Sequence, residues 1–433
     1  MISSYSVWDA TGDGVPALLG KQRPADVIPA GLLGLLVSTG VWSVRRVLWH
    51  VERLPVPEDR GDAVACLAPH LPAAHLGEVL AIAAAITEPP VRAMALAALV
   101  PHLPDEQRTI ALRHATAAAL TSRSSRISAL TSLAPHLPEH QRDTVLRPDV
   151  TAILDASFGE NRMFMLGDFA PHLPADLLAE VSAKACAFTD EDRRGKALVA
   201  LAPHLPTAAL ISQAWAAAEA ITGGSGRAKA MAALAPRVSA ERRPSTLQQA
   251  LAAAGAVIEP HARAETLAGL IAHLPDDQRA AVLEQALTAA AAITDHLYGN
   301  AVPVDAIAAL APHLPAGRRS AVLGRTLRAA GAIGRENWRM FELSRLAPHL
   351  PPELRTEALA MMAGIGREQW RAAGLAFIGP HLSAGQLTEA VAVADAIQDA
   401  YWQAHAIAGL AWHLPPAERT RAVAALTIVT PER

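Results

Sequence analysis

The chain has 433 residues, of which 51% are apolar and only 4% aromatic, and its formal net charge is −3. Alanine supplies much of the apolar content and is the best helix former, so the composition favours closely packed helices. Binding of a phosphate backbone normally needs a clustered basic face, and no block of like charge stands out in the sequence. We therefore expect no nucleic-acid partner.

The first 57 residues match no internal repeat and are predicted to form an N-terminal cap. They include Val27 to Trp42, an apolar stretch that is shorter than the about 20 residues of a membrane span and that contains a proline and three glycines. We predict a buried or end-capping helix here and no membrane association. The chain does not begin with a signal-peptide pattern, and Cys66 and Cys186 have no partners at metal-binding spacing, which indicates a reduced, cytoplasmic location.

From about residue 58 onward, a unit of 32 to 40 residues repeats along the chain. Its most regular part is the hexapeptide Leu-Ala-Pro-His-Leu-Pro, which begins at residues 67, 133, 201, 310 and 346. With its relatives there are eleven copies, in which the first-proline position falls at residues 69, 101, 135, 171, 203, 236, 272, 312, 348, 380 and 412. Periods of this size are typical of stacked helical hairpins.

The unit from residue 72 to residue 103 shows how one copy folds. Pro72 opens a helix at a position where its missing N–H costs nothing, and apolar residues then recur every three or four positions, as on one helical face. A Thr-Glu-Pro-Pro break follows, and a second helix runs from about Val91 to Val100. Pro101 ends it, because a proline pushes the preceding residue out of the helical region. We call these helices A and B, and the Pro-His-Leu-Pro segment after helix B the corner.

One such hairpin cannot bury its apolar face alone, whereas a stack of hairpins can. The sequence therefore predicts an all-α fold, a right-handed α-solenoid of about eleven helical hairpins over residues 58–433. The sequence of helix B, as in Arg92 to Leu99, resembles bacterial HEAT-like and tetratricopeptide-like α-helical repeats. It is similar to repeats of bacterial signalling and conflict proteins, which are often attached to signal-transducing ATPases. The resemblance covers about residues 58 to 428 and implies the fold more strongly than a function, since such repeats bind unrelated partners.

Ten of the seventeen histidines lie at the corners. Equivalent corners of stacked hairpins are about 8–10 Å apart, whereas zinc needs ligand nitrogens within about 2.1 Å, so we predict no metal site. We expect instead that each imidazole caps the end of helix B, donating to its free carbonyls and favoured by the helix dipole. These histidines are His70, His102, His136, His172, His204, His273, His313, His349, His381 and His413.

An arginine stands nine residues before the corner proline position in nine of the eleven copies. A cation at the start of helix B opposes the helix dipole, so a compensating contact is expected. The favoured interpretation is packing, with hydrogen bonds to loop carbonyls and to nearby acids such as Glu336 and Glu368. The alternative is a cationic rim that binds an acidic ligand. The arginines are Arg60, Arg92, Arg126, Arg162, Arg194, Arg227, Arg263, Arg339 and Arg371.

Recognition is expected where the copies differ. The positions seven and three residues before the corner lie on one face of helix B, four residues apart, and vary in size and charge. We call this face the B-helix stripe. It could line a groove for a partner helix, a peptide or a small ligand, and drift on a solvated surface is the alternative. Its candidate binding residues are Phe164, Asp168, Lys196, Lys229, Phe341, Arg345, Phe377 and His405.

A second candidate is a C-terminal aromatic patch. Ten residues before the corner, the last three copies carry tryptophan, and two of these precede an arginine. Trp and Arg are enriched at binding hot spots, although filling of the core between helices is the alternative. The patch comprises Trp338, Arg339, Trp370, Arg371 and Trp402.

Irregular units add three expectations. Pro148 lies inside a predicted helix A and should kink or split it. The long loop at residues 295–305 could lie on a binding face. At the C-terminal end, a helix A without a helix B should leave Val423, Leu426 and Ile428 partly open, which points to self-association or a partner surface there.

No catalytic motif stands out in the sequence, and we predict no catalytic residue, cofactor or metal. The favoured function is a non-catalytic scaffold that recognises a protein, a peptide or a small ligand, in the manner of a sensing component of a bacterial signalling or defence system. The alternative is an enzyme with a small-molecule pocket inside the helical superhelix, of the natural-product tailoring or HEAT-repeat base-excision type. In that case Asp168 or His405 would be available for proton transfer.

Overall fold

The computed structural model describes residues 28–121, 126–155, 163, 165–293 and 303–426. Over these ranges it contains 24 α-helices, joined by turns and single 3₁₀ turns, and no strand. The all-α fold class is therefore confirmed. None of the helices in these ranges combines the length and the apolar character that crossing a membrane requires.

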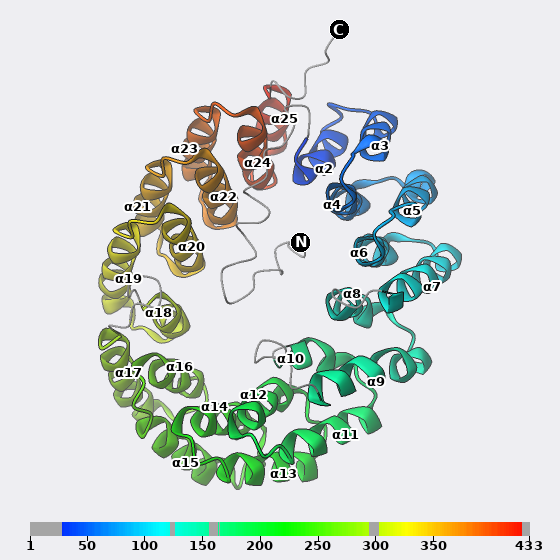
Figure 1. The fold of residues 1–433 in the computed structure, drawn as a ribbon. Coiled ribbons are helices and arrows are strands. Elements are labelled where there is room, and N and C mark those ends of the chain that lie inside the picture. The colour runs from blue at the N-terminus through cyan, green and yellow to red at the C-terminus, as the bar shows by residue number, and fades with distance from the viewer. Residues whose placement is uncertain (1–27, 122–125, 156–162, 164, 294–302, 427–433) are drawn as a thin grey trace. The chain divides into compact units, whose positions relative to one another are not determined.

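The chain divides into two units, which are described separately (Figure 1). Unit 1 joins Met1–His136 to Ala330–Arg433, and unit 2 is Leu137–Ala329. The helices of unit 1 are α2 (Ala30–Ser38), α3 (Val44–Arg53), α4 (Pro57–Leu67), α5 (Leu76–Ala84), α6 (Pro89–Leu99), α7 (Asp105–Thr121), α8 (Arg126–Leu133), α20 (Glu336–Leu346), α21 (Pro352–Ala363), α22 (Glu368–Ile378), α23 (Ala384–Asp395), α24 (Ala400–Ala411) and α25 (Pro416–Ala424). Those of unit 2 are α9 (Glu139–Asp155), α10 (Met165–Phe169), α11 (Ala175–Cys186), α12 (Glu191–Leu201), α13 (Ala208–Glu219), α14 (Gly224–Leu234), α15 (Arg243–Gly255), α16 (Pro260–Ile271), α17 (Asp276–Ala291), α18 (Val304–Leu310) and most of α19 (Ala316–Gly331).

The corners end helix B in two stages. Helix α6 ends at Leu99, and the chain continues for one 3₁₀ turn, Val100–His102, before Leu103 becomes extended at φ −81° and ψ 144°. The corner proline therefore lies inside the 3₁₀ turn, where its missing N–H removes no α-helical hydrogen bond. Leu103 is buried, so this corner also supplies an apolar side chain to the core, as most others do, whereas Leu71 and Leu382 are partly exposed.

Helices A and B form two layers in each unit. Successive B helices pack side by side, as α4, α6 and α8 do in unit 1 and α10 to α18, taken alternately, do in unit 2. Successive A helices contact one another less extensively. Each stack therefore curves with its B helices on the inner side, as Figure 1 shows for either unit alone.

Helix α2 brings together the first and last described repeats of unit 1. It packs against α24 on one side and against α4 on the other, so it lies within the row of B helices. The helix is apolar on all sides, and Leu32, Leu33, Leu35 and Leu36 have no exposed surface. The apolar stretch seen in the sequence is thus a buried helix, as predicted.

An aromatic contact also joins the N-terminal and C-terminal parts of unit 1. His70, at the corner after α4, stacks on Trp412, at the corner after α24, with ring centroids 4.4 Å apart and an interplanar angle of 19°. Gly34 of α2 makes room for this, because a side-chain carbon there would lie 2.5 Å from Cδ2 of His70.

Two expectations about irregular regions are corrected, the first of them in part. Pro148 does not split its helix, since α9 is a single helix of 17 residues, while a kink at Pro148 stays a prediction. Leu146 and Val150, on either side of the proline, are fully buried, and this burial holds the helix together across the missing hydrogen bond. At the C-terminal end, Val423 and Leu426 are 0% and 2% exposed rather than partly open, since α25 packs against α24.

The third C-terminal residue of interest, Ile428, and most of the long loop at residues 295–305 lie outside the described residues. Self-association through the C-terminal end stays a prediction, although Val423 and Leu426 are not accessible for it.

The close approach of α22 and α24 makes a testable prediction. A side-chain carbon on Gly409 would lie 2.3 Å from Cβ and 2.5 Å from Cα of Ala376, whereas Gly269, at the same position of another repeat, has open space around it. We expect Gly409→Ala to lower the free energy of unfolding by about 2 kcal/mol, because the backbones must separate. Gly269→Ala should instead raise it by up to about 1 kcal/mol through helix propensity. Denaturant unfolding checks both, and equal effects of the two variants would contradict the packing described.

Candidate recognition surface

The arginines at the start of the B helices form hydrogen bonds within their own hairpins. Each of five donates to a carbonyl six residues earlier, in the loop that connects helix A to helix B. The distances are 2.7 Å from Arg60 to Leu54, 2.9 Å from Arg92 to Ile86, 2.7 Å from Arg194 to Phe188, 2.8 Å from Arg339 to Ile333 and 3.1 Å from Arg371 to Ile365. These contacts favour the packing interpretation over a cationic rim.

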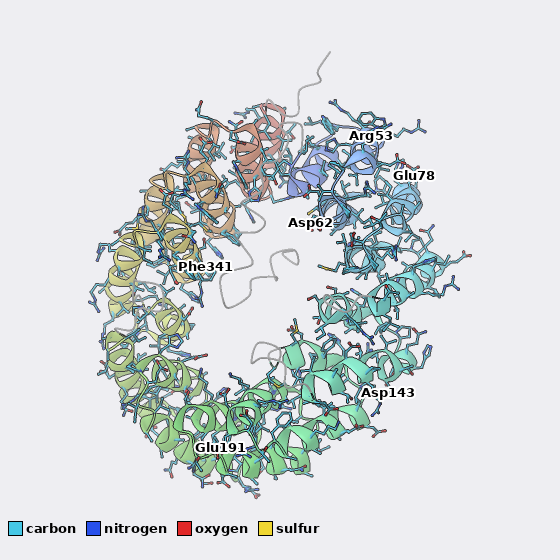
Figure 2. The ribbon with its side chains drawn as sticks, viewed as in Figure 1. Arg53, Asp62, Glu78, Asp143, Glu191 and Phe341 are labelled. Atoms are coloured by element: carbon cyan, nitrogen blue, oxygen red, sulfur yellow. The ribbon has the colours of Figure 1, made fainter. Side chains whose placement is uncertain are left out.

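Glutamates at the start of the same helices link one repeat to the next. Glu336 accepts hydrogen bonds from the backbone N–H groups of Gly366 and Arg367, at 2.7 and 3.0 Å. Glu368 accepts from those of Gln398 and Asp399 at 2.8 and 2.9 Å. In unit 2, Glu191, labelled in Figure 2, receives the corresponding N–H groups and a threonine hydroxyl. Each carboxylate thus caps the N-terminus of the next B helix, where its charge suits the helix dipole.

A second series of arginines, which was not predicted from the sequence, donates hydrogen bonds to backbone carbonyls at the corners. Arg108 of α7 donates to the carbonyls of Val100 and Leu103 at 3.3 and 2.9 Å. Five further arginines, each five residues after the corner leucine position, donate to that residue's carbonyl; they are Arg142, Arg243, Arg279, Arg319 and Arg419. The constant spacing was a readable signal in the sequence.

The surroundings of the corner histidines change the pKa of the imidazole. Burial lowers the pKa of His70, His136, His204, His273, His313, His349, His381 and His413 below the usual 6.5. Nearby charged or ionisable groups lower it further in most cases, for example Arg108 beside His136. These shifts favour the neutral imidazole, which keeps one N–H donor; capping of helix B by the corner histidines stays a prediction. Arginines such as Arg108 also donate to corner carbonyls.

Residues that could bind a metal do not gather in the described part of the chain, where no group of three or more His, Cys, Asp or Glu is suitably placed. Cys66 and Cys186 are both free thiols. Burial and the nearby Asp62 raise the pKa of the Cys66 thiol to about 12, so this thiol is unreactive at neutral pH.

In unit 2 the B-helix stripe is a row of paired charges. Lys229 of α14 pairs with Glu265 of α16 at 2.7 Å. His261 lies 4.0 Å from both Glu265 and Asp305, so the row continues to α18. Lys196 of α12 is exposed and pairs with Asp192 on its own helix at 2.7 Å. Asp168 of α10 is exposed; partial desolvation raises the pKa of its carboxyl, and Phe164 lies outside the described residues.

In unit 1, aromatic side chains lie on and beside the stripe on α20 and α24. The rings of Trp338 and Phe341 meet edge to face at 5.9 Å, and the guanidinium of Arg345 lies 5.2 Å from the Phe341 ring centroid. Figure 2 shows Phe341 on α20. On α24, Trp402 lies 5.8 Å from His405. These five side chains are partly exposed.

The predicted aromatic patch is therefore split by its environment. Trp370 is 6% exposed and fills the core, whereas Trp338 and Trp402 are partly exposed beside the stripe. Phe377 on α22 is also partly exposed. Arg339 and Arg371 belong to the loop-carbonyl series and are not part of an exposed patch.

Glu342 is the main residue on this surface that the sequence analysis missed. It stands six residues before the corner, where seven other copies have alanine, and this substitution was the available signal. Its Oε2 atom is buried and has no hydrogen-bond partner in the described structure. Burial raises the pKa of the carboxyl to about 7. On α20, Glu342 follows Trp338 by four residues and precedes Arg345 by three, so the three side chains share one face.

Comparison with known proteins gives no family. No protein-family model and no curated protein matches the sequence. One solved structure, described as the crystal structure of Ton1535 from Thermococcus onnurineus NA1, aligns with 16% identity over 80% of this chain and 98% of that chain. Its TM-score of 0.27 is too low to carry an argument about fold or function.

The buried carboxyl of Glu342 predicts a pH-dependent stability. Because its folded-state pKa of about 7 exceeds the usual 4.5, the folded protein holds this proton more tightly than the unfolded chain does. Its contribution to the free energy of unfolding therefore falls as the pH rises from about 4.5 to about 7. We expect Glu342→Gln to stabilise the protein by about 1–3 kcal/mol at pH 8 and by less at pH 5.

Urea unfolding at the two pH values measures this, with Glu389→Gln as the control, since Glu389 is exposed. A gain from Glu342→Gln that is the same at both pH values would show that the carboxyl is not desolvated.

Proposed function

We propose that the chain is a non-catalytic recognition scaffold whose helical hairpins form a right-handed α-solenoid of the HEAT-like or tetratricopeptide-like kind. In this proposal the partner is a protein or a peptide, and it binds along the B-helix stripe. The chain would act as a sensing component of a bacterial signalling or defence system, because its repeats resemble those of such proteins.

The observation that carries the proposal is that the chain has two sets of polar residues. One set is hydrogen-bonded within the stack of helices, and the other lies partly exposed on the B-helix stripe. The regularly spaced arginines and glutamates are engaged by loop carbonyls and backbone N–H groups, as with Arg371 and Glu368. These residues hold the stack and are not available to a ligand. The stripe lies on the inner side of each stack, keeps partly exposed side chains and changes from one repeat to the next.

The chemistry of the stripe favours a polypeptide partner. In unit 1 it presents Phe341 and Arg345, with Trp338 beside them, and aromatic residues and arginine are enriched at protein interfaces. In unit 2 it presents alternating charges, such as Lys229 and Glu265, which set register and partner choice more than affinity. An extended or helical peptide offers aromatic contacts and spaced charges together.

Site-specific photo-crosslinking tests this proposal. A photoreactive phenylalanine analogue is placed at Phe341 or His405 on the stripe, and at Glu389 or Arg113 as controls, since both are exposed on A helices. We expect a shared crosslinked partner from the two stripe positions in cells of the native host, and none from the controls. Replacing Phe341 and Arg345 together by alanine should reduce recovery of that partner about tenfold or more.

Trp370→Ala is not a suitable binding variant, because Trp370 is buried and its loss would disturb packing. Crosslinking of the same proteins from control and stripe positions would overturn the proposal.

A further inference from the structure

Helix α3 carries an exposed face that the fold does not explain. Its apolar residues Val47, Leu48 and Val51 are buried, which accounts for one side of the helix. The other side exposes Arg45, Arg46, Trp49, Glu52 and Arg53, and Trp49 is 57% exposed. A tryptophan that is exposed to this extent buries little apolar surface, so its side chain contributes little to the stability of the fold.

The arginines at the start of α3 stand where they lower helix stability. Arg45 and Arg46 lie in the first turn, whose helix dipole disfavours cations, and that turn contains no acidic residue. Glu52 is the single carboxylate on the helix. Three guanidinium groups and one carboxylate give this face a net positive charge, in contrast to a chain whose net charge is −3.

Aromatic rings hold two of these guanidinium groups in place. The Arg53 guanidinium lies 4.0 Å from the Trp49 ring centroid, and Arg53 Nη1 donates to the Trp49 carbonyl at 3.4 Å. The Arg46 guanidinium lies 3.9 Å from the ring centroid of Trp42, which is buried. Stacking on a ring face leaves the N–H groups of a guanidinium free in its plane, where a carboxylate can accept two of them.

We propose that the exposed face of α3 binds an acidic segment of a partner protein, with Arg45, Arg46 and Arg53 pairing its carboxylates and Trp49 contacting its backbone or apolar side chains. This surface lies on α3, outside the row of B helices that carries the stripe, and does not depend on the function proposed for the stripe. Figure 2 labels Arg53 on α3 and, in the row of B helices, Asp62 on α4.

Two other anionic partners fit this face less well. A helix that binds a lipid surface inserts its apolar side, but Val47, Leu48 and Val51 are packed into the protein. A nucleic acid needs a long basic track, whereas α3 has 10 residues and is about 15 Å long. The net negative charge of the whole chain repels a long polyanion more than a short acidic segment.

Fluorescence anisotropy of a labelled hexaglutamate peptide on the full-length protein tests the proposal. We expect binding at low salt that weakens as salt is added. Reversing Arg45, Arg46 and Arg53 to Glu should weaken it about 10- to 100-fold, and Trp49→Ala about threefold to tenfold. The matched control reverses three other exposed arginines, Arg113, Arg325 and Arg421, to Glu and should change affinity less than threefold.

Circular dichroism should show the same helix content for all variants. Equal weakening by the two triple variants would overturn the proposal, because it would make the binding a general charge effect. So would absence of peptide binding to the parent protein. Tighter binding of phosphatidylserine vesicles or of a 20-mer single-stranded DNA, lost in the α3 variant, would assign the face to those partners instead.

Discussion

Some neighbouring B helices approach each other so closely that a small residue is required at their point of contact. A side-chain carbon on Gly195 would lie 3.3 Å from Cα of Gly226, and one on Gly409 would lie within 2.5 Å of the Ala376 backbone. This spacing explains a composition rich in alanine and poor in aromatic residues. The repeat position of Gly409 is held by Arg345 on α20 and by Gly269 on α16, and Gly269 has open space around it, so the closeness of approach differs from one pair of B helices to the next.

The all-α fold could be predicted because its determinants are local. The determinants are prolines at the helix ends, a period of 32 to 40 residues and apolar residues every three to four positions. All of them act within one hairpin. The role of the first arginine series was also accessible, since Arg92 and the carbonyl it binds are six residues apart. The stripe was found because it varies, but the sequence gives no indication of which of its residues are exposed.

The residues that were missed depend on neighbours distant in the sequence. Glu342 stands where alanine is usual, but whether its carboxyl is hydrated or buried depends on the packing around α20. Trp370 and Trp402 occupy equivalent positions, yet only Trp370 is buried, since burial depends on the adjacent helices and not on the repeat. The pKa of a corner histidine such as His349 likewise depends on desolvation by the surrounding helices, which the repeat pattern does not show.

The last repeat shows how a departure from the pattern follows from a long-range contact. The corner after α24 has Trp412 where most copies have proline, which seems an irregularity in the sequence alone. In unit 1 its neighbour is the corner after α4, and the indole stacks on His70. Gly34 of α2 provides the space, because any side chain there would collide with the imidazole. A proline offers no flat aromatic ring for His70 to cover, so the substitution is explained by a partner more than 300 residues away in the sequence.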